Sequence, residues 1–311
     1  MSGVSASLTG ASGLGGRSTL VGSAGAAQAG IAAAAARYSR AVDQVSSGRA
    51  IVQPSDDVIG TDKALGLRQA LAAEERYARA STDATGWLSA TESGLDQAST
   101  VLNRLRDLTV QAGSDAMSAQ ERTILATEVR GLREELLQAT NTTYLGRSVF
   151  GGTTGTGKAF VEVDGVVEPT EDLGAGAVRR ALAPGVEVRV DTSRAQAFGE
   201  GDTSVFAVLD RVEAAVTAGS AESSTALADV DGALGRLRTA WTDVGTRYAQ
   251  VDRLRSTGED RSLSLTAAKA GVEEIDLAKS LMELSMHEKA YQAALGAAAK
   301  VVTPTIMDFL R

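Results

Sequence analysis

The 311-residue sequence contains no cysteine and only one histidine, His287. Without cysteine the chain can form no disulfide bond, no thiolate metal site and no cysteine nucleophile. This fits a protein that is made in a reducing cytosol and works outside it without covalent cross-links. One histidine without a second histidine or a cysteine cannot complete a zinc site or a histidine-based triad. We therefore interpret His287 as a partly exposed helix residue and expect no metal and no cofactor.

Aromatic residues make up only 4% of the chain, and there are only 4 prolines. This composition, with abundant Ala, Leu, Glu and Arg, favours long helices in thin bundles. No run of about 18 apolar residues is present, so no transmembrane segment is predicted. Residues 1–16 lack the basic start and leucine-rich core of a secretory signal. The formal net charge of −8, with no cluster of Lys and Arg, argues against a nucleic-acid-binding protein.

Apolar residues near both ends of the chain follow the alternating steps of four and three that are typical of a coiled-coil seam. In residues 271–311 the pattern is interrupted at Glu288 and again at Thr305. We expect the two terminal helices to pair with each other and with neighbouring molecules. The N-terminal helix is rich in Gly and Ala, so we expect it to order only on assembly. The predicted assembly interface comprises Ile31, Ala35, Tyr38, Val42, Val45, Leu277, Leu281, Leu284, Tyr291, Leu295, Ala298, Val302 and Phe309.

Helix-start signals organise the first half of the chain. Residues 54–57 (PSDD) supply a proline and capping side chains for a long helix. Ser118 and Glu121 form the capping box of a second helix, and the short connection between the two predicts an antiparallel helical hairpin.

The period changes to that of short strands in the middle of the sequence, where residues 164–165 (DG) and 184–185 (PG) are turn signals between valine-rich runs. Helical spacing resumes at Asp202, and we expect the polar patch around Gly258 to loosen the last long helix.

The predicted fold class is mainly α: an elongated multi-helix bundle with paired N- and C-terminal coiled-coil helices and a small β-rich insertion domain. We expect the β module to cap the end of the bundle away from the termini. The predicted segments are a flexible N-terminal extension (1–16), an N-terminal assembly helix (17–50), a helical hairpin of the core bundle (51–143), the β insertion (144–201), returning helices (202–265) and a C-terminal assembly helix (266–311).

Two patterns could indicate binding chemistry, and both have simpler interpretations. Residues 152–158 (GTTGTGK) match most of a phosphate-binding loop. However, Ala159 stands where Ser or Thr would hold magnesium, and a strand rather than a helix is predicted to follow, which favours a glycine-rich turn. Asp56 and Asp57 lack further acidic residues at the spacing of a cation loop, so we interpret them as helix caps. No constellation supports catalysis, and we predict that the chain is not an enzyme.

Several short stretches resemble the bacterial flagellin family, and they fall in that family's order. In the first half these are VSSGR at 45–49, PSDD at 54–57, LRDL at 105–108 and QA at 111–112. Asn141, YL at 144–145 and FGGT at 150–153 are similar to hook-filament junction members more than to filament members. The same is true of IDLA at 275–278 and MDFLR at 307–311.

This resemblance implies a structural adaptor of the bacterial flagellum that joins hook to filament and nucleates flagellin assembly. It implies export in an unfolded state by the flagellar type III system, without a cleavable signal peptide, and an extracellular place in the flagellum. The implied partners are further copies of the chain in a ring, another hook-associated protein, flagellin subunits and an export chaperone. Alternatives are a filament flagellin with a reduced outer domain, a cytoplasmic coiled-coil scaffold and, through the near match to a phosphate-binding loop, an NTPase.

Overall fold

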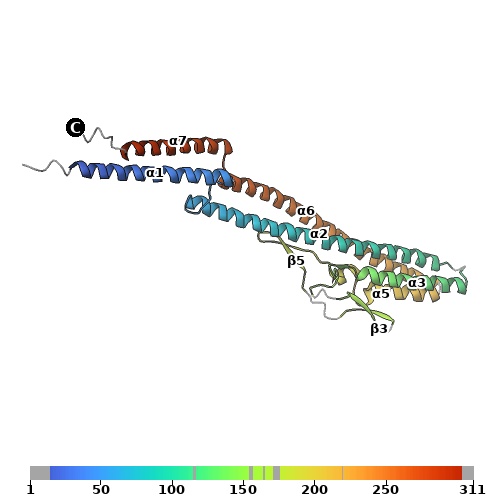
Figure 1. The fold of residues 1–311 in the computed structure, drawn as a ribbon. Helices are drawn as coiled ribbons and strands as arrows, with labels where there is room; N and C mark the ends of the chain where they lie inside the picture. Colours follow the sequence, from blue (N-terminus) through green and yellow to red (C-terminus); the bar gives the residue numbers. More distant parts are fainter. Residues whose placement is uncertain are drawn as a thin grey trace, which may run out of the picture. The chain divides into compact units, whose positions relative to one another are not determined.

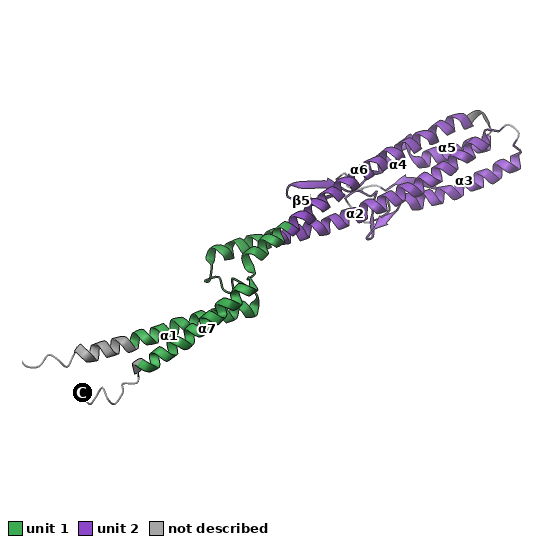
Figure 2. Cartoon of the chain, turned by 90° about the horizontal axis from the view of Figure 1, so that it is seen from above, with its two compact units in different colours: residues 1–70, 264–311 green, residues 71–263 purple. Residues whose placement is uncertain are grey.

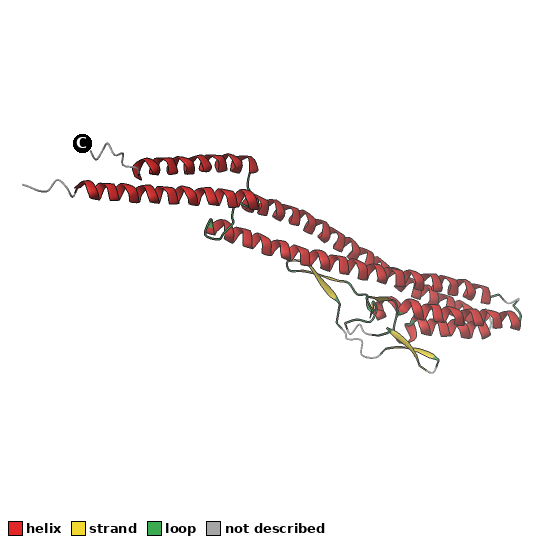
Figure 3. Cartoon of the chain, in the orientation of Figure 1, coloured by secondary structure: helices red, strands yellow, loops and turns green. Residues whose placement is uncertain are grey.

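The computed structural model describes residues 15–114, 117–153, 157–163, 165–170, 176–218 and 220–302. Long helices dominate it, with a few short strands (Figures 1 and 3). Two compact units can be distinguished, one made of residues 1–70 and 264–311 and the other of residues 71–263 (Figure 2). We call them the terminal unit and the central unit. The predicted fold class, a mainly α helical bundle with a small β insertion, is confirmed.

The terminal unit holds helices α1 (Gly15–Ser47) and α7 (Leu277–Val302), which lie side by side and run in opposite directions (Figures 1 and 2). It also contains the start of α2 (Val58–Ala112) and the end of α6 (Ser220–Glu273). Asp57 caps α2 as predicted, because its carboxylate accepts a hydrogen bond of 2.9 Å from the backbone N–H of Gly60. The stretch expected as one C-terminal seam is in fact two helices, since α6 continues to Glu273 and α7 begins only at Leu277.

The central unit is a bundle of α2, α3 (Ala119–Thr140), α5 (Val205–Ala218) and α6. Ser118 and Glu121 form the predicted capping box at the start of α3. Each helix turns a regular stripe of apolar residues inward, and these stripes build one continuous core. Fully buried members from the four helices include Leu88, Leu95, Leu102, Leu105, Leu136, Leu209, Leu237 and Val244.

The expected loosening near Gly258 is wrong, because α6 runs through this region without interruption. The polar residues are instead used across the helix pair. Arg261 of α6 forms an ion pair of 3.3 Å with Glu74 of α2, whose side chain is almost completely buried. Gly258 lies beside the same carboxylate, which an added Cβ would contact. A patch that is polar in sequence therefore marks a packed helix contact.

The β region consists of three separate antiparallel pairs: β1 (Thr143–Tyr144) with β2 (Arg147–Ser148), β3 (Phe160–Val163) with β4 (Val166–Pro169), and β5 (Arg179–Ala183) with β6 (Val186–Arg189). A short helix, α4 (Arg194–Phe198), and the 3₁₀ turn η1 (Gly201–Thr203) follow. The expectation that this module caps the far end is wrong. Its strands lie along the side of the helices (Figures 1 and 3), where Tyr144 packs edge-on against Trp87 of α2.

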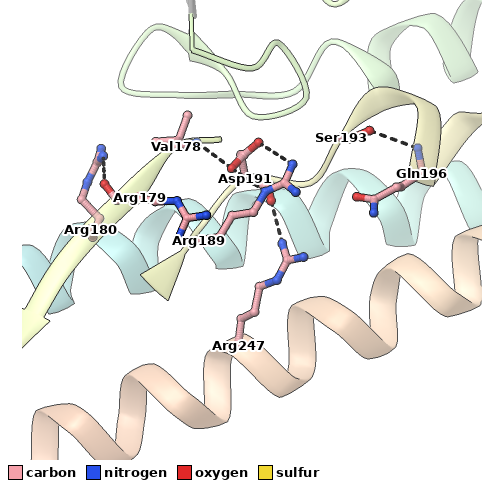
Figure 4. A network of polar contacts seen from close by, with 8 residues as sticks. All are labelled: Val178, Arg179, Arg180, Arg189, Asp191, Ser193, Gln196 and Arg247. Carbon is pink, nitrogen blue, oxygen red and sulfur yellow. Dashed lines mark hydrogen bonds and ion pairs between the residues drawn. The ribbon is translucent and has the colours of Figure 1, made fainter. Parts of the chain in front are cut away.

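Asp191 joins the β5–β6 pair to the helices (Figure 4). Its buried carboxylate accepts hydrogen bonds from the backbone N–H of Val178, at 2.7 Å, and from two nitrogens of Arg189, each at 3.0 Å. Its backbone carbonyl accepts a bond of 2.6 Å from Arg247 of α6. The hydrogen bond to Asp191 raises the pKa of Arg189, whereas burial lowers the pKa of Arg247. The carboxylate of Asp191 thus holds a strand end and a strand side chain, while the backbone carbonyl of the same residue holds α6.

Candidate assembly interface

The contact between α1 and α7 follows a regular heptad spacing. Tyr38 of α1 stacks on Tyr291 of α7 with ring planes 3° apart and centroids 6.1 Å apart, which fixes the register of the pair. On either side of this stack the covered positions recur in steps of four and three. The partly or fully buried residues in these steps are Ala27, Ile31, Ala34, Tyr38, Ala41 and Val45 on α1, and Ser280, Leu284, His287, Tyr291, Ala294 and Ala298 on α7.

This internal seam uses some of the predicted interface residues. Ile31, Ala35, Tyr38 and Val45 are half-buried, as are Leu284 and Tyr291, and Ala298 is buried. Val302 ends α7, but its side chain lies outside the described residues, and Phe309 lies outside them altogether.

Three exposed leucines form a second stripe on α7, separate from the internal seam. Leu277, Leu281 and Leu295 are 57%, 47% and 42% exposed. Leu281 and Leu295 lie on the flank of the internal seam, one position after its members Ser280 and Ala294, and Leu277 lies one turn before Leu281. On α1, Val42 is likewise exposed beside the buried Ala41. We call Val42, Leu277, Leu281 and Leu295 the outer stripe.

The internal seam differs from the predicted one because half of its covered positions are small, either Ala or Ser. Sequence reasoning selected leucines and placed an interruption at Glu288, whereas the internal seam passes one residue earlier, through His287, without a break. Ala34, Ala41 and Ala294 were missed for the same reason. Small side chains allow two helices to approach closely but bury little apolar surface. An uninterrupted heptad that includes Ala and His was the signal that could have found them.

A second contact joins the segment that follows α1 to the junction between α6 and α7. Gly48 and Ala50 lie in the first of these regions, and Glu273 and Ile275 in the second. The backbone N–H of Ala50 donates to the carbonyl of Glu273 at 2.8 Å, and that of Ile275 donates to the carbonyl of Gly48 at 3.3 Å. Arg49 and Glu274 form an antiparallel β-bridge between these bonds. We call residues 48–50 and 273–275, together with Arg68, the crossing clip.

Glu273 is the electrostatic centre of the crossing clip. Its carboxylate, which is almost completely buried, accepts a hydrogen bond of 2.8 Å from Arg68 and lies 3.7 Å from the guanidinium of Arg49. The hydrogen bond from Arg68 is the main reason why the pKa of Glu273 is lowered. An open hollow of about 470 Å³ lies beside this group and is lined by Arg49, Lys269 and Leu277, among others.

We expect the crossing clip to loosen in acid. Because the pKa of Glu273 is lower in the folded than in the unfolded chain, its stabilisation is present above the ordinary value of about 4.3 and is lost as the pH falls further. Hydrogen-exchange protection factors of the Ala50 and Ile275 amides should therefore fall as the pH is lowered below about 4.3. Glu273→Gln should remove this step, whereas Glu283→Gln, on an exposed 4.0 Å pair with Lys279, should leave it unchanged. The same acid step in Glu273→Gln would contradict this assignment.

Other candidate chemistry has a structural explanation. The carboxylate of Asp56 accepts hydrogen bonds from the backbone N–H groups of Val52 and Gln53. Strand β3 follows the glycine-rich residues 151–153 and 157, where a phosphate-binding loop would need a helix. Within the described part of the chain, no group of three or more acidic or histidine side chains is placed to hold a metal ion. No described helix is long and apolar enough to cross a membrane.

Comparison with known proteins agrees with this architecture. Residues 19–154 match the model of the bacterial flagellin N-terminal helical region. The flagellar hook-associated protein 3 of Escherichia coli is 29% identical over 298 residues, covering 85% of this chain and 90% of that protein. The chain is therefore similar to the bacterial flagellin family along its N-terminal helical region and to a hook-associated protein over most of its length. Flagellins and hook-associated proteins are structural proteins of the flagellum rather than enzymes, in agreement with the prediction made from the sequence.

Two further proteins show how the similarity is distributed. The flagellin of Bacillus subtilis is 25% identical over 291 residues, covering 87% of this chain and 91% of that protein. The crystal structure of flagellar hook-associated protein 3 from Legionella pneumophila has the same fold, with a TM-score of 0.58 and 15% sequence identity. That match covers 65% of this chain and 96% of the other. The chain is therefore more similar in sequence to the hook-associated protein of Escherichia coli than to this flagellin.

Proposed function

We propose that this protein is a structural adaptor of the bacterial flagellum that forms a ring between hook and filament and provides the surface on which flagellin nucleates. The observation that carries the proposal is the outer stripe. Val42, Leu277, Leu281 and Leu295 remain open to solvent although α1 and α7 already cover each other. A helix pair with a second apolar stripe is suited to pack against further copies and against other flagellar subunits.

The similarity to hook-associated protein 3 supports the position of this adaptor in the flagellum. We further propose that the chain is exported unfolded by the flagellar type III system and that an export chaperone binds it before export. The composition of the internal seam supports this view, because a helix pair in which half of the covered side chains are Ala or Ser gains limited stability by itself. That the terminal helices order only on assembly remains a prediction.

A strain lacking this protein tests the proposal. We expect electron microscopy to show hooks without filaments, and flagellin to accumulate in the medium because it has no surface on which to nucleate. Restoring the gene should restore filaments. Intact filaments in the deletion strain would contradict the adaptor role.

The abundance of the chain tests the main alternative, a filament flagellin. Sheared filaments should contain this 31.9 kDa chain only as a trace component if it forms a single ring. A dominant band of that mass would instead identify a filament subunit, a reading favoured by the 25% identity to the Bacillus subtilis flagellin.

A further inference from the structure

The turn between β1 and β2 places an apolar side chain where neither the backbone nor the solvent favours it. Tyr144 pairs with Arg147, so Leu145 and Gly146 form a two-residue hairpin loop. Their φ angles are +50° and +77°, values at which the first position normally carries Asn, Asp or Gly. Leu145 is also 80% exposed, more than any other large apolar residue in the described part of the chain.

The side chains next to Leu145 are closely packed on α2. The ring of Tyr144 lies edge-on to Trp87 of α2 with centroids 6.0 Å apart, and the guanidinium of Arg147 lies 5.2 Å from the centre of the same indole. Gly86 is required below the hairpin, because a Cβ there would collide with the ring of Tyr144. Close packing on α2 thus holds the hairpin in which Leu145 is exposed and has a strained backbone conformation. Strain of this kind is retained where a site has a function.

A positive charge accompanies the exposed leucine. Arg147 follows it by two residues, and no carboxylate among the described residues lies within ion-pair distance of its guanidinium. The surface that receives this turn should therefore offer an apolar gap with an acidic rim. Because the chain carries a formal net charge of −8, another copy of it is a suitable partner.

One face of α3 has these properties. Glu121, Ile124, Glu128, Gly131 and Glu135 follow one another in steps of three and four and therefore share a face. Ile124 is 62% exposed, and no atom lies within 4 Å of the position that a Cβ on Gly131 would occupy. Gly131 consequently leaves a gap next to Glu135, which forms no ion pair among the described residues, whereas Glu128 on the other side is already paired with Arg104. The exposed Ile124 lies two turns away.

We propose that the Leu145 turn of one copy docks at Gly131 on α3 of a second copy, with Arg147 next to Glu135. The turn and the α3 face are different surfaces of the same unit, so the contact is head-to-tail and can repeat around a closed ring. This inference rests on the proposed ring function and adds a lateral contact made by the central unit.

Engineered cysteines test the contact directly, because the natural chain has none. In the full chain carrying Leu145→Cys and Gly131→Cys, mild oxidation of isolated flagella should give dimers and higher multiples of 31.9 kDa. Either single variant should stay monomeric on a non-reducing gel, and a mixture of the two single variants should give dimers only. The proposal would be overturned if the double variant gave monomers alone, or if its higher multiples persisted on a gel run under reducing conditions.

A second variant separates folding from docking. Asn suits the backbone of this turn, so Leu145→Asn should raise the Tm of the purified chain by about 2–4 °C while reducing the number of filaments per cell several-fold. A raised Tm with normal filament numbers, or an unchanged or lowered Tm, would overturn the proposal. Failure of the adaptor function is recognised separately, by filaments in the deletion strain, and oxidation of the concentrated purified double variant then still tests the contact.

Discussion

Leu281→Asp is expected to abolish incorporation of the chain into the flagellum while leaving the purified protein folded. Leu281 is 47% exposed in the single chain, so the substitution removes little internal packing and should change the free energy of unfolding by no more than about 0.5 kcal/mol. In the assembly the same side chain would be buried. Loss of about 1.5–3 kcal/mol per contact, together with burial of a charge, weakens each contact by about 10-fold to more than 100-fold.

The measurement is complementation of the deletion strain, with filaments counted by electron microscopy and incorporated protein detected by immunoblotting of isolated flagella. Leu295→Asp should behave in the same way, since Leu295 belongs to the outer stripe as well. Leu281→Met keeps an apolar side chain of similar volume and should restore filaments. Normal filament numbers with Leu281→Asp would show that the outer stripe has no role in assembly.

The second large effect is expected for Asp191→Ala, which should destabilise the central unit by about 2–4 kcal/mol. The substitution leaves the amide of Val178 without its acceptor and removes the charged partner of Arg189. The cost stays below that of a fully buried ion pair, because the guanidinium of Arg189 keeps some contact with solvent. Chemical denaturation of the purified chain, followed by circular dichroism, measures it.

Asp210→Ala is the matched control for this substitution. Asp210 pairs with Arg133 at 3.0 Å but is itself largely exposed, so its loss should cost about 1 kcal/mol or less. If both variants lost the same stability, the Asp191 network would have no special role in joining the β5–β6 pair to the helices.

Local signals predicted much of the helical architecture. The Ser118–Glu121 capping box and the cap at Asp57 depend on side chains within three residues of the helix start, so a single sequence contains all the information they need. The course of α6 through Gly258 could not be predicted in this way. There the decisive contact is the ion pair between Arg261 and Glu74, residues far apart in the sequence.

The candidate interface was only partly predictable for a related reason. The four-three spacing identified the two helices that pair, but two patterns on α7 have that spacing. They share Leu284, Tyr291 and Ala298, and the positions between these residues are offset by one residue. The sequence pattern favoured the stripe with Leu277, Leu281 and Leu295, whereas the single chain covers the stripe with Ser280, His287 and Ala294. Which stripe faces α1 depends on how closely two Ala-rich surfaces can approach, and this is a property of the pair rather than of either helix.

The crossing clip has a consequence for how this protein can change over generations. Arg49 and Arg68 share one acceptor, Glu273, which lies 205 residues after Arg68 in the sequence. Losing the acid would leave two guanidinium groups facing each other, and losing one arginine would weaken the neutralisation of a carboxylate that is almost completely buried. Substitutions at these three positions should therefore occur together among relatives. The sequences near the two ends of the chain are thus expected to change together during evolution.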